Sequence, residues 1–225
     1  MSTRTSHGGK RFNPIKVYVS FFDHILPQTN KNMSETNRLN DFKKHYLEST
    51  SIPLLEFIEM GKTYRSKIEN VRSFEDPTLK AHSLARDIPA AVISCRVRTR
   101  DFTKSIDENI RGYNGIVMYE IPKQRNKQKI FEALKQKPWV WYISESADGR
   151  YIDVIVPLDN GNYEDHWIYC DTLEKELRKA GLLVNEDCGG LYHMMHVTYD
   201  EDAWMNEDCV LYELPKRQTR KRLEE

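Results

Sequence analysis

The segment that most constrains the fold is residues 113–158, because it combines apolar strand-like runs with an amphipathic helical pattern. Residues 116–121 are mostly β-branched or bulky and end at Pro122, which is typical of a buried strand. Residues 123–137 carry apolar side chains at helical spacing, so we expect a helix that lies over the sheet. These apolar side chains are Ile130, Phe131 and Leu134.

The clearest turn of the chain follows that helix. Residues 139–144 and 151–156 are strand-like and flank Asp148-Gly149, and an Asp-Gly pair between two strands is a strong hairpin signal. The expected fold class is therefore α/β in the α+β sense, with a mixed or antiparallel sheet and helices packed on it. The other expected elements are strands at 15–22, 89–98, 191–199 and 210–214, helices within 41–69, at 76–86 and at 163–180, an exposed loop at 27–40 and an acidic turn at 200–208.

Length and composition favour one soluble domain. We assign residues 15–214 to it, with a flexible basic arm at 1–14 and a basic tail at 215–225. Charged residues make up 30% of the chain and aromatic residues 11%, which argues against a disordered protein. No apolar run approaches the roughly 20 residues that span a bilayer, so the expected location is the cytoplasm. The four cysteines form no C-x-x-C pair, and we expect free thiols.

Charge is unevenly distributed along the chain, although basic and acidic residues are equal in number at 34 each. Residues 1–135 hold 24 basic and 15 acidic residues, whereas residues 136–214 hold 5 and 17. The basic part favours nucleic acid as a partner, and the acidic part favours a basic protein. Folding could also bring basic and acidic residues of the two parts together and cancel most of their electrostatic field. The sequence leaves open whether the charged parts bind partners or neutralise each other.

A row of cations lies within the basic part. Arg96, Arg98, Arg100 and Lys104 recur at mostly even spacing, which would place them on one side of an extended segment. There they could contact successive phosphates, so we take them as candidate nucleic-acid-binding residues. A charged strand edge that blocks edge-to-edge association would explain the same spacing.

One set of cysteine and histidine residues is a candidate zinc site. Cys188, His193, His196 and Cys209 have the side chains that zinc prefers. However, two histidines three residues apart on an extended segment point to opposite faces, so one ion cannot readily bind both. We assign no zinc site.

A second set consists of carboxylates at or near strand ends. Glu120, Asp153, Glu186 and Asp187 could converge on Mg²⁺ and a substrate phosphate. The chain has no Gly-rich phosphate loop with its lysine, no G-x-S-x-G and no H-E-x-x-H. The residues by themselves therefore describe an α/β domain without a complete active site or an assigned cofactor.

Six short segments have the order and spacing of a known family. They are VYVSFF at 17–22, IPAAVIS at 88–94, NGIVM at 114–118, SES at 144–146, DVIVP at 153–157 and VTYD at 197–200. Together they resemble the VirE N-terminal domain family, a branch of the archaeo-eukaryotic primase-polymerase superfamily found in Bacteroidetes mobile elements and phages. The resemblance implies an RRM-like core and, in active relatives, metal-dependent nucleotidyl transfer onto nucleic acid.

Five positions of the family pattern have changed in this chain. The metal-binding Asp-x-Asp pair of the relatives falls on Glu120 and Pro122, and their third aspartate falls on Asn185. The basic residue after their Ser-rich turn falls on Asp153, and the arginine of their last strand falls on His193. Two-metal chemistry needs bridging carboxylates, which a proline cannot supply, and an added carboxylate repels a polyphosphate. The resemblance therefore implies a degenerate catalytic site.

Three functional hypotheses follow. The first is a catalytically inactive primase-polymerase-like protein of a phage or mobile element, which binds nucleic acid or protein in replication or host interaction. The second is a divergent nucleotidyltransferase that uses Glu120 with Asp153 or Glu186 and Mg²⁺ or Mn²⁺. The third is a purely protein-binding anti-defence factor.

Overall fold

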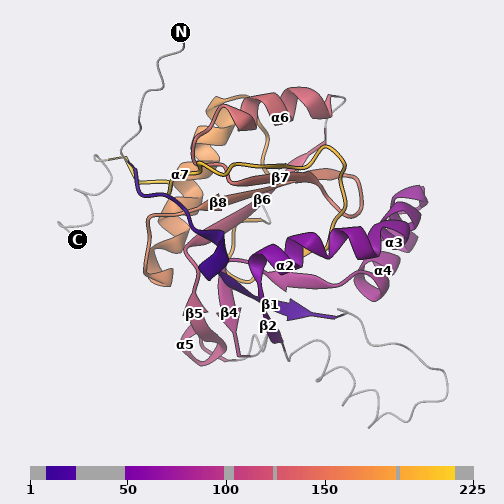
Figure 1. Cartoon of the computed structure of the whole chain (residues 1–225), viewed down its shortest axis with the longest axis horizontal. Helices are drawn as coiled ribbons and strands as arrows, with labels where there is room; N and C mark the ends of the chain where they lie inside the picture. Colours follow the sequence, from indigo (N-terminus) through magenta and orange to yellow (C-terminus); the bar gives the residue numbers. More distant parts are fainter. Residues whose placement is uncertain (1–8, 24–48, 99–103, 124–125, 186–187, 216–225) are drawn as a thin grey trace.

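Two antiparallel sheets of four strands each carry the fold (Figure 1). The structure, a computed structural model, describes residues 9–23, 49–98, 104–123, 126–185 and 188–215. The first sheet has the order β2 (Thr50–Pro53), β1 (Tyr18–Phe22), β3 (Ala90–Val92) and β9 (Met194–His196). The second has the order β10 (Trp204–Met205), β7 (Tyr142–Glu145), β8 (Tyr151–Pro157) and β6 (Ile116–Pro122). A two-stranded ribbon pairs β4 (Cys95–Val97) with β5 (Ile110–Tyr113).

The described residues also form six α-helices and two short 3-10 helices. The α-helices are α2 (Leu54–Glu59), α3 (Gly61–Ser73), α4 (Pro77–Asp87), α5 (Ile106–Asn109), α6 (Lys127–Lys135) and α7 (His166–Lys179). The 3-10 helices are η1 (Pro14–Lys16) and η3 (Tyr163–Asp165). Among these residues no helix is long and apolar enough to cross a membrane.

The second sheet is buried on both faces. Val117 and Tyr119 of β6 pack with α6 and α7, whereas the alternating residues Ile116 and Met118 pack with α2, α3 and the first sheet. Figure 1 shows α6 and α7 on one side of this sheet and α2, α3 and α4 on the other. The predicted α+β class, with antiparallel strands and packed helices, is confirmed.

The central segment folds largely as predicted. The strand at 116–121 is β6 and the strand at 151–156 is β8, while α6 begins after Asn126, whose side chain accepts a hydrogen bond from Lys129 N. The hairpin is present, but β7 begins at residue 142 instead of 139. The helices at 76–86 and 163–180 are α4 and η3 with α7, and Gly181 after α7 has φ +79° as expected of a C′ residue.

The prediction of one strand at 89–98 is wrong. β3 and β4 belong to different sheets, because the chain turns between them. Asn114 holds this turn: its backbone N donates to Ser94 O at 3.0 Å and its Nδ2 donates to Ile93 O at 2.9 Å. The polar residues that form α5 and β5 give no strand pattern, so the sequence does not predict the ribbon.

Smaller corrections concern the chain ends and the last strand. Residues 14–16 form η1 instead of a strand, because Pro14 starts a helical turn that Asn13 caps. Of the strand predicted at 191–199, only the three residues of β9 form a strand. Isolated bridges replace the strand predicted at 210–214. The acidic turn predicted at 200–208 contains the short strand β10. The loop at 27–40 and the part of the 41–69 pattern before residue 49 lie outside the described residues.

Candidate functional site

The polar end of the β6–β8 pair forms a candidate site. Glu120 of β6 lies directly opposite Asp153 of β8, and Ser144 of β7 lies opposite Asp153 on its other side. Alternate residues of a strand share a face, so these polar side chains continue the row that begins with the core residues Met118 and Ile155. The core between the two sheets therefore ends in a polar patch.

A cavity of about 260 Å³ opens at this patch. Glu120, Asp153 and Asn185 line it, and His193 joins them because its Nε2 lies 3.7 Å from Glu120 Oε1. Pro122 ends β6 opposite Tyr151, which is itself a lining residue. The structure thus gathers the five degenerate positions around one end of the second sheet.

Glu120 is held by its neighbours. Asn185 Nδ2 donates to Glu120 Oε2 at 2.9 Å, and the Asn185 backbone N donates to Glu120 O at the same distance. Burial alone would raise the pKa of Glu120, but His193 and Asn185 stabilise the carboxylate, and the net effect is a lowered pKa. Glu120 is therefore ionised at neutral pH, and its carboxylate already accepts a hydrogen bond from Asn185.

Asp153 has the opposite environment. Its side chain is 2% exposed, and within the described part of the chain its Oδ1 accepts no hydrogen bond. Burial raises the pKa of Asp153 well above its usual value of 3.8, and the charges of Glu120 and Asp148 raise it further against the weaker effect of Arg72. Of the two carboxyl groups, the environment therefore favours the charged form of Glu120 and the protonated form of Asp153.

One further cavity residue adds no charge. His196 of β9 directs its Nδ1 toward Ile88 O at 3.2 Å. Burial lowers the pKa of His196 to about 4, although Ile88 O and the nearby Asp148 and Glu120 oppose the shift. The imidazole is therefore neutral at pH 7.

These side chains do not fit a two-metal centre. Among the residues that the structure describes, no group of three or more His, Cys, Asp and Glu side chains is placed to hold an ion. Position 122 has no carboxylate, and burial raises the pKa of Asp153, so binding a cation there would have to displace the proton that this environment favours. Glu186 and Asp187, the other carboxylates considered from sequence, lie outside the described residues.

The cysteines of the zinc set are also separated. Cys188 packs on the α6–α7 side of the second sheet, and Cys209 is buried in the core on its other side. All four cysteines have free thiols. Burial raises the pKa of the Cys188 thiol to about 12, so it is protonated at neutral pH.

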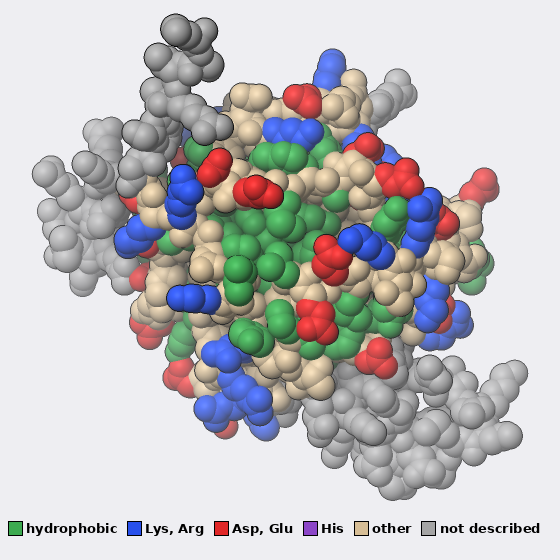
Figure 2. Space-filling model, in the orientation of Figure 1, with side chains coloured by type: hydrophobic (Ala, Val, Ile, Leu, Met, Phe, Trp, Pro, Cys, Tyr) green, Lys and Arg blue, Asp and Glu red, His purple; other side chains and the backbone are tan. Residues whose placement is uncertain are grey.

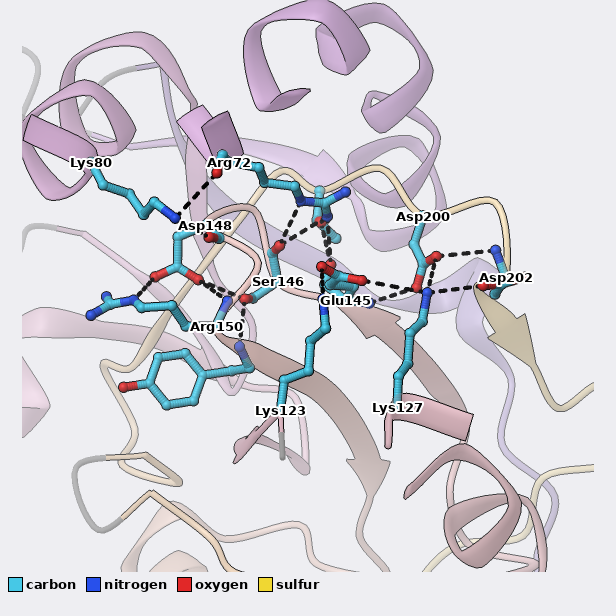
Figure 3. A network of polar contacts seen from close by, with 12 residues as sticks. Arg72, Lys80, Lys123, Lys127, Glu145, Ser146, Asp148, Arg150, Asp200 and Asp202 are labelled. Carbon is cyan, nitrogen blue, oxygen red and sulfur yellow. Dashed lines mark hydrogen bonds and ion pairs between the residues drawn. The ribbon is translucent and has the colours of Figure 1, made fainter. Parts of the chain in front are cut away.

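The β7–β8 hairpin forms one wall of the cavity, and Figure 3 shows how cations hold it. Arg72 of α3 donates from Nη2 to Ser146 O at 2.9 Å and to Glu145 O at 3.2 Å. Lys80 of α4 donates to Asp148 O at 3.2 Å. The Ser146 hydroxyl donates to Asp148 Oδ1 at 2.7 Å, so its proton is not directed to a ligand.

The sequence does not identify Arg72 and Lys80 as the residues that hold the β7–β8 hairpin. Arg72 and Lys80 lie more than 60 residues from the hairpin and bond mainly to backbone carbonyl groups, which leave no residue-type signal. Arg150 could have been found, because an arginine two residues after an Asp-Gly turn aspartate can pair with it, as Arg150 Nε does with Asp148 Oδ2.

The ribbon carries the second candidate site. Arg96 and Arg98 are exposed and alternate with the buried Val97, which places them on one face as predicted from their spacing. Lys104 and Arg111 are also exposed. We call Arg96, Arg98, Lys104 and Arg111 the basic ribbon. Arg100 lies outside the described residues.

The basic ribbon retains its charge. Within the described part of the chain none of its four side chains forms an ion pair. Gly112 lies opposite Arg96, and a Cβ at Gly112 would come within 2.7 Å of Arg96 Nη2, so the missing side chain makes room for the guanidinium. Figure 2 shows Lys and Arg side chains gathered low in the view, over the region of β4, β5 and α5. Arg111 and β5 are the parts of this surface that the sequence pattern misses.

Elsewhere, folding interleaves the two oppositely charged parts of the sequence. Lys127 of α6 contacts Asp200 at 2.7 Å and Asp202 at 3.0 Å, and Lys123 contacts Glu145 at 2.6 Å. Lys10 with Asp159, Arg11 with Asp208 and Arg65 with Glu201 make similar pairs. These contacts neutralise part of the acidic surface that the sequence offers to a basic protein.

Comparison with known proteins yields no match: no family model, no curated protein and no solved structure is significantly similar to the chain. The resemblance to the VirE N-terminal domain family therefore stays a prediction.

Proposed function

We propose that the chain is a non-catalytic, primase-polymerase-like protein of a phage or mobile element that binds nucleic acid through the basic ribbon. The observation that carries the proposal is the exposed face of β4 and β5, where Arg96, Arg98 and Arg111 have no carboxylate partner among the described residues. Cations on an extended element suit a row of phosphates, because each neutralised phosphate releases counterions.

The cavity supports the non-catalytic part of the proposal. A nucleotidyltransferase of the resembled type needs several anionic ligands that are free to bridge metal ions. Here Glu120 is engaged by Asn185 and His193, and burial favours the protonated form of Asp153. A binding protein derived from a polymerase would be expected to lose free metal ligands in this way.

Fluorescence anisotropy with labelled DNA and RNA across a salt series tests the binding. We expect Arg96→Gln/Arg98→Gln/Arg111→Gln to flatten the dependence of log affinity on log salt by about 2, since each phosphate contact contributes about 0.7–0.9. The matched control removes three exposed lysines from helices elsewhere, Lys62→Gln/Lys129→Gln/Lys175→Gln, and should keep the slope. Equal effects of the two variants, or no binding at low salt, would refute the proposal. Indifference to nucleic acid would instead favour a purely protein-binding factor.

One observation favours a second candidate, a divergent metal-dependent nucleotidyltransferase. Glu120 and Asp153 face the same cavity from adjacent strands, as that function requires. It predicts incorporation of labelled nucleotide with Mg²⁺ or Mn²⁺ that Glu120→Gln abolishes, because the amide keeps the side-chain shape but removes the charge. Absence of incorporation with either metal would dismiss this candidate.

A further inference from the structure

A second, larger cavity lies at the amino-terminal end of α7. It has a volume of about 530 Å³, within the usual range for sites that bind small molecules or parts of larger ones. Aromatic and aliphatic side chains from three separate segments form most of its wall. They include Ile106 of α5, Tyr163 of η3, Trp167 in the first turn of α7, and Leu191 and Tyr192 of the loop before β9.

The wall of this cavity is preformed. His166 Nε2 donates to Gly189 O at 2.7 Å, which leaves His166 Nδ1 to accept from the Tyr113 hydroxyl at 2.8 Å. Cys170 Sγ also donates to Gly189 O, at 3.0 Å. Burial lowers the pKa of His166, so this neutral tautomer persists at pH 7. The loop is therefore fixed against α7 without a ligand.

Two side chains at the rim are unusually exposed for their type. Trp167 is 68% exposed and Ile106 is 45% exposed, and apolar side chains exposed together around one cavity can mark an interaction surface. The acidic residue among the lining, Glu164, disfavours a phosphate or carboxylate inside the cavity. The wall thus suits a flat, uncharged ring that stacks on an aromatic side chain.

The basic ribbon adjoins this cavity. Ile106 belongs to α5, which lies between β4 and β5 in the chain and begins two residues after Lys104. The buried face of the ribbon, with Val97 and Ile110, packs in the same apolar cluster as Leu191 and Tyr192. A ligand that is anionic along its backbone and apolar in its rings would match both surfaces.

We propose that this cavity accepts an unstacked base of a single-stranded nucleic acid whose phosphates lie along the basic ribbon. The inference rests on the proposed function and adds to it the form of nucleic acid. Bases in a duplex are stacked and cannot enter such a cavity, whereas exposed bases stack on aromatic side chains with little sequence preference. Trp167 is the stacking platform, and Tyr163 and Tyr192 border the ring.

Titration of the full chain with fluorescein-labelled oligo(dT), oligo(U) and a DNA duplex tests the inference. We expect Trp167→Ala to bind the single strands about tenfold more weakly and the duplex unchanged, because stacking on one aromatic residue is worth about that factor. Trp167→Phe should retain most of the affinity. Leu79→Ala on α4, another exposed apolar side chain at 56% exposure, is the matched control and should bind like the unmodified protein. The oligo(dT) and oligo(U) arms distinguish DNA from RNA.

The outcomes separate the two proposals. If Trp167→Ala binds single strands and duplex as the unmodified protein does, while the arginine variant loses both, the base cavity is refuted and the basic ribbon stands. If the unmodified protein binds neither form at low salt, the proposed function itself fails. Quenching of tryptophan emission by oligo(dT) that Trp167→Ala removes would place the base at this residue.

Discussion

Replacing Gly61 with alanine is expected to lower the free energy of unfolding by at least about 3 kcal/mol. The new Cβ would lie 2.0 Å from Thr198 O and 3.0 Å from Thr198 C, and both are backbone atoms that cannot rotate away. Alanine is otherwise better than glycine within a helix by up to about 1 kcal/mol, so a net loss must come from this contact. Urea denaturation followed by intrinsic fluorescence measures the change.

Gly161→Ala is the matched control for this prediction. A Cβ at Gly161 has no heavy atom within 4 Å and its φ is not positive, so its stability should change by less than about 0.5 kcal/mol. Equal stability of the two variants would show that α3 does not approach the end of the first sheet so closely.

The contact at Gly61 matters for the cavity because Thr198 supports the hairpin. Thr198 Oγ1 donates to Glu145 O at 2.5 Å and accepts from Arg72 Nη2 at 3.3 Å. The close approach at Gly61 thereby fixes the segment after β9 that, together with Arg72, holds the hairpin wall of the cavity. A larger residue at position 61 should loosen this wall as well as destabilise the fold.

Local sequence pattern predicts the centre of the fold well. β6, α6 and β8 combine strong apolar periodicity with a cap or a turn residue, so local preference and tertiary packing agree. The ribbon is missed because α5 and β5 are polar in sequence. Their position depends on Asn114 and on an apolar cluster contributed by distant segments, which no window of neighbouring residues contains.

The candidate sites, like the fold, are predictable from the sequence only where they depend on local pattern. Sequence spacing suffices to place Arg96 and Arg98 on one face, because strand alternation is a local property. Positions near strand ends suggest that Glu120 and Asp153 converge, whereas Asn185 enters only through the family resemblance, and the register of β6 on β8 decides that they meet in one cavity. The aromatic cavity gives no sequence signal at all, because residues 106, 163–170 and 188–192 meet only in the folded chain.

Replacing Asp153 with asparagine is expected to stabilise the protein by about 2 kcal/mol at pH 8. In the folded state Asp153 keeps its proton, whereas in the unfolded chain its pKa is near 3.8, so the folded state binds more protons above that pH. Stability of the unmodified protein therefore falls as pH rises from about 3.8 toward the raised folded pKa. One pKa unit corresponds to about 1.4 kcal/mol, which limits this cost to about 6 kcal/mol at pH 8, and burial of the asparagine amide reduces the gain.

The dependence on pH distinguishes this effect from simple repacking. Urea denaturation at several pH values should show the advantage of Asp153→Asn shrinking as the pH falls toward about 3.8 and disappearing below it, where aspartic acid is protonated in both states. Asp208→Asn, at an exposed carboxylate, is the control and should change stability by less than about 1 kcal/mol at each pH. If the advantage did not vary with pH, or if Asp153→Asn were less stable at pH 8, Asp153 would be ionised in the folded protein. The cavity would then hold the second carboxylate that a metal-dependent nucleotidyltransferase requires, and the case for a non-catalytic protein would lose its main support.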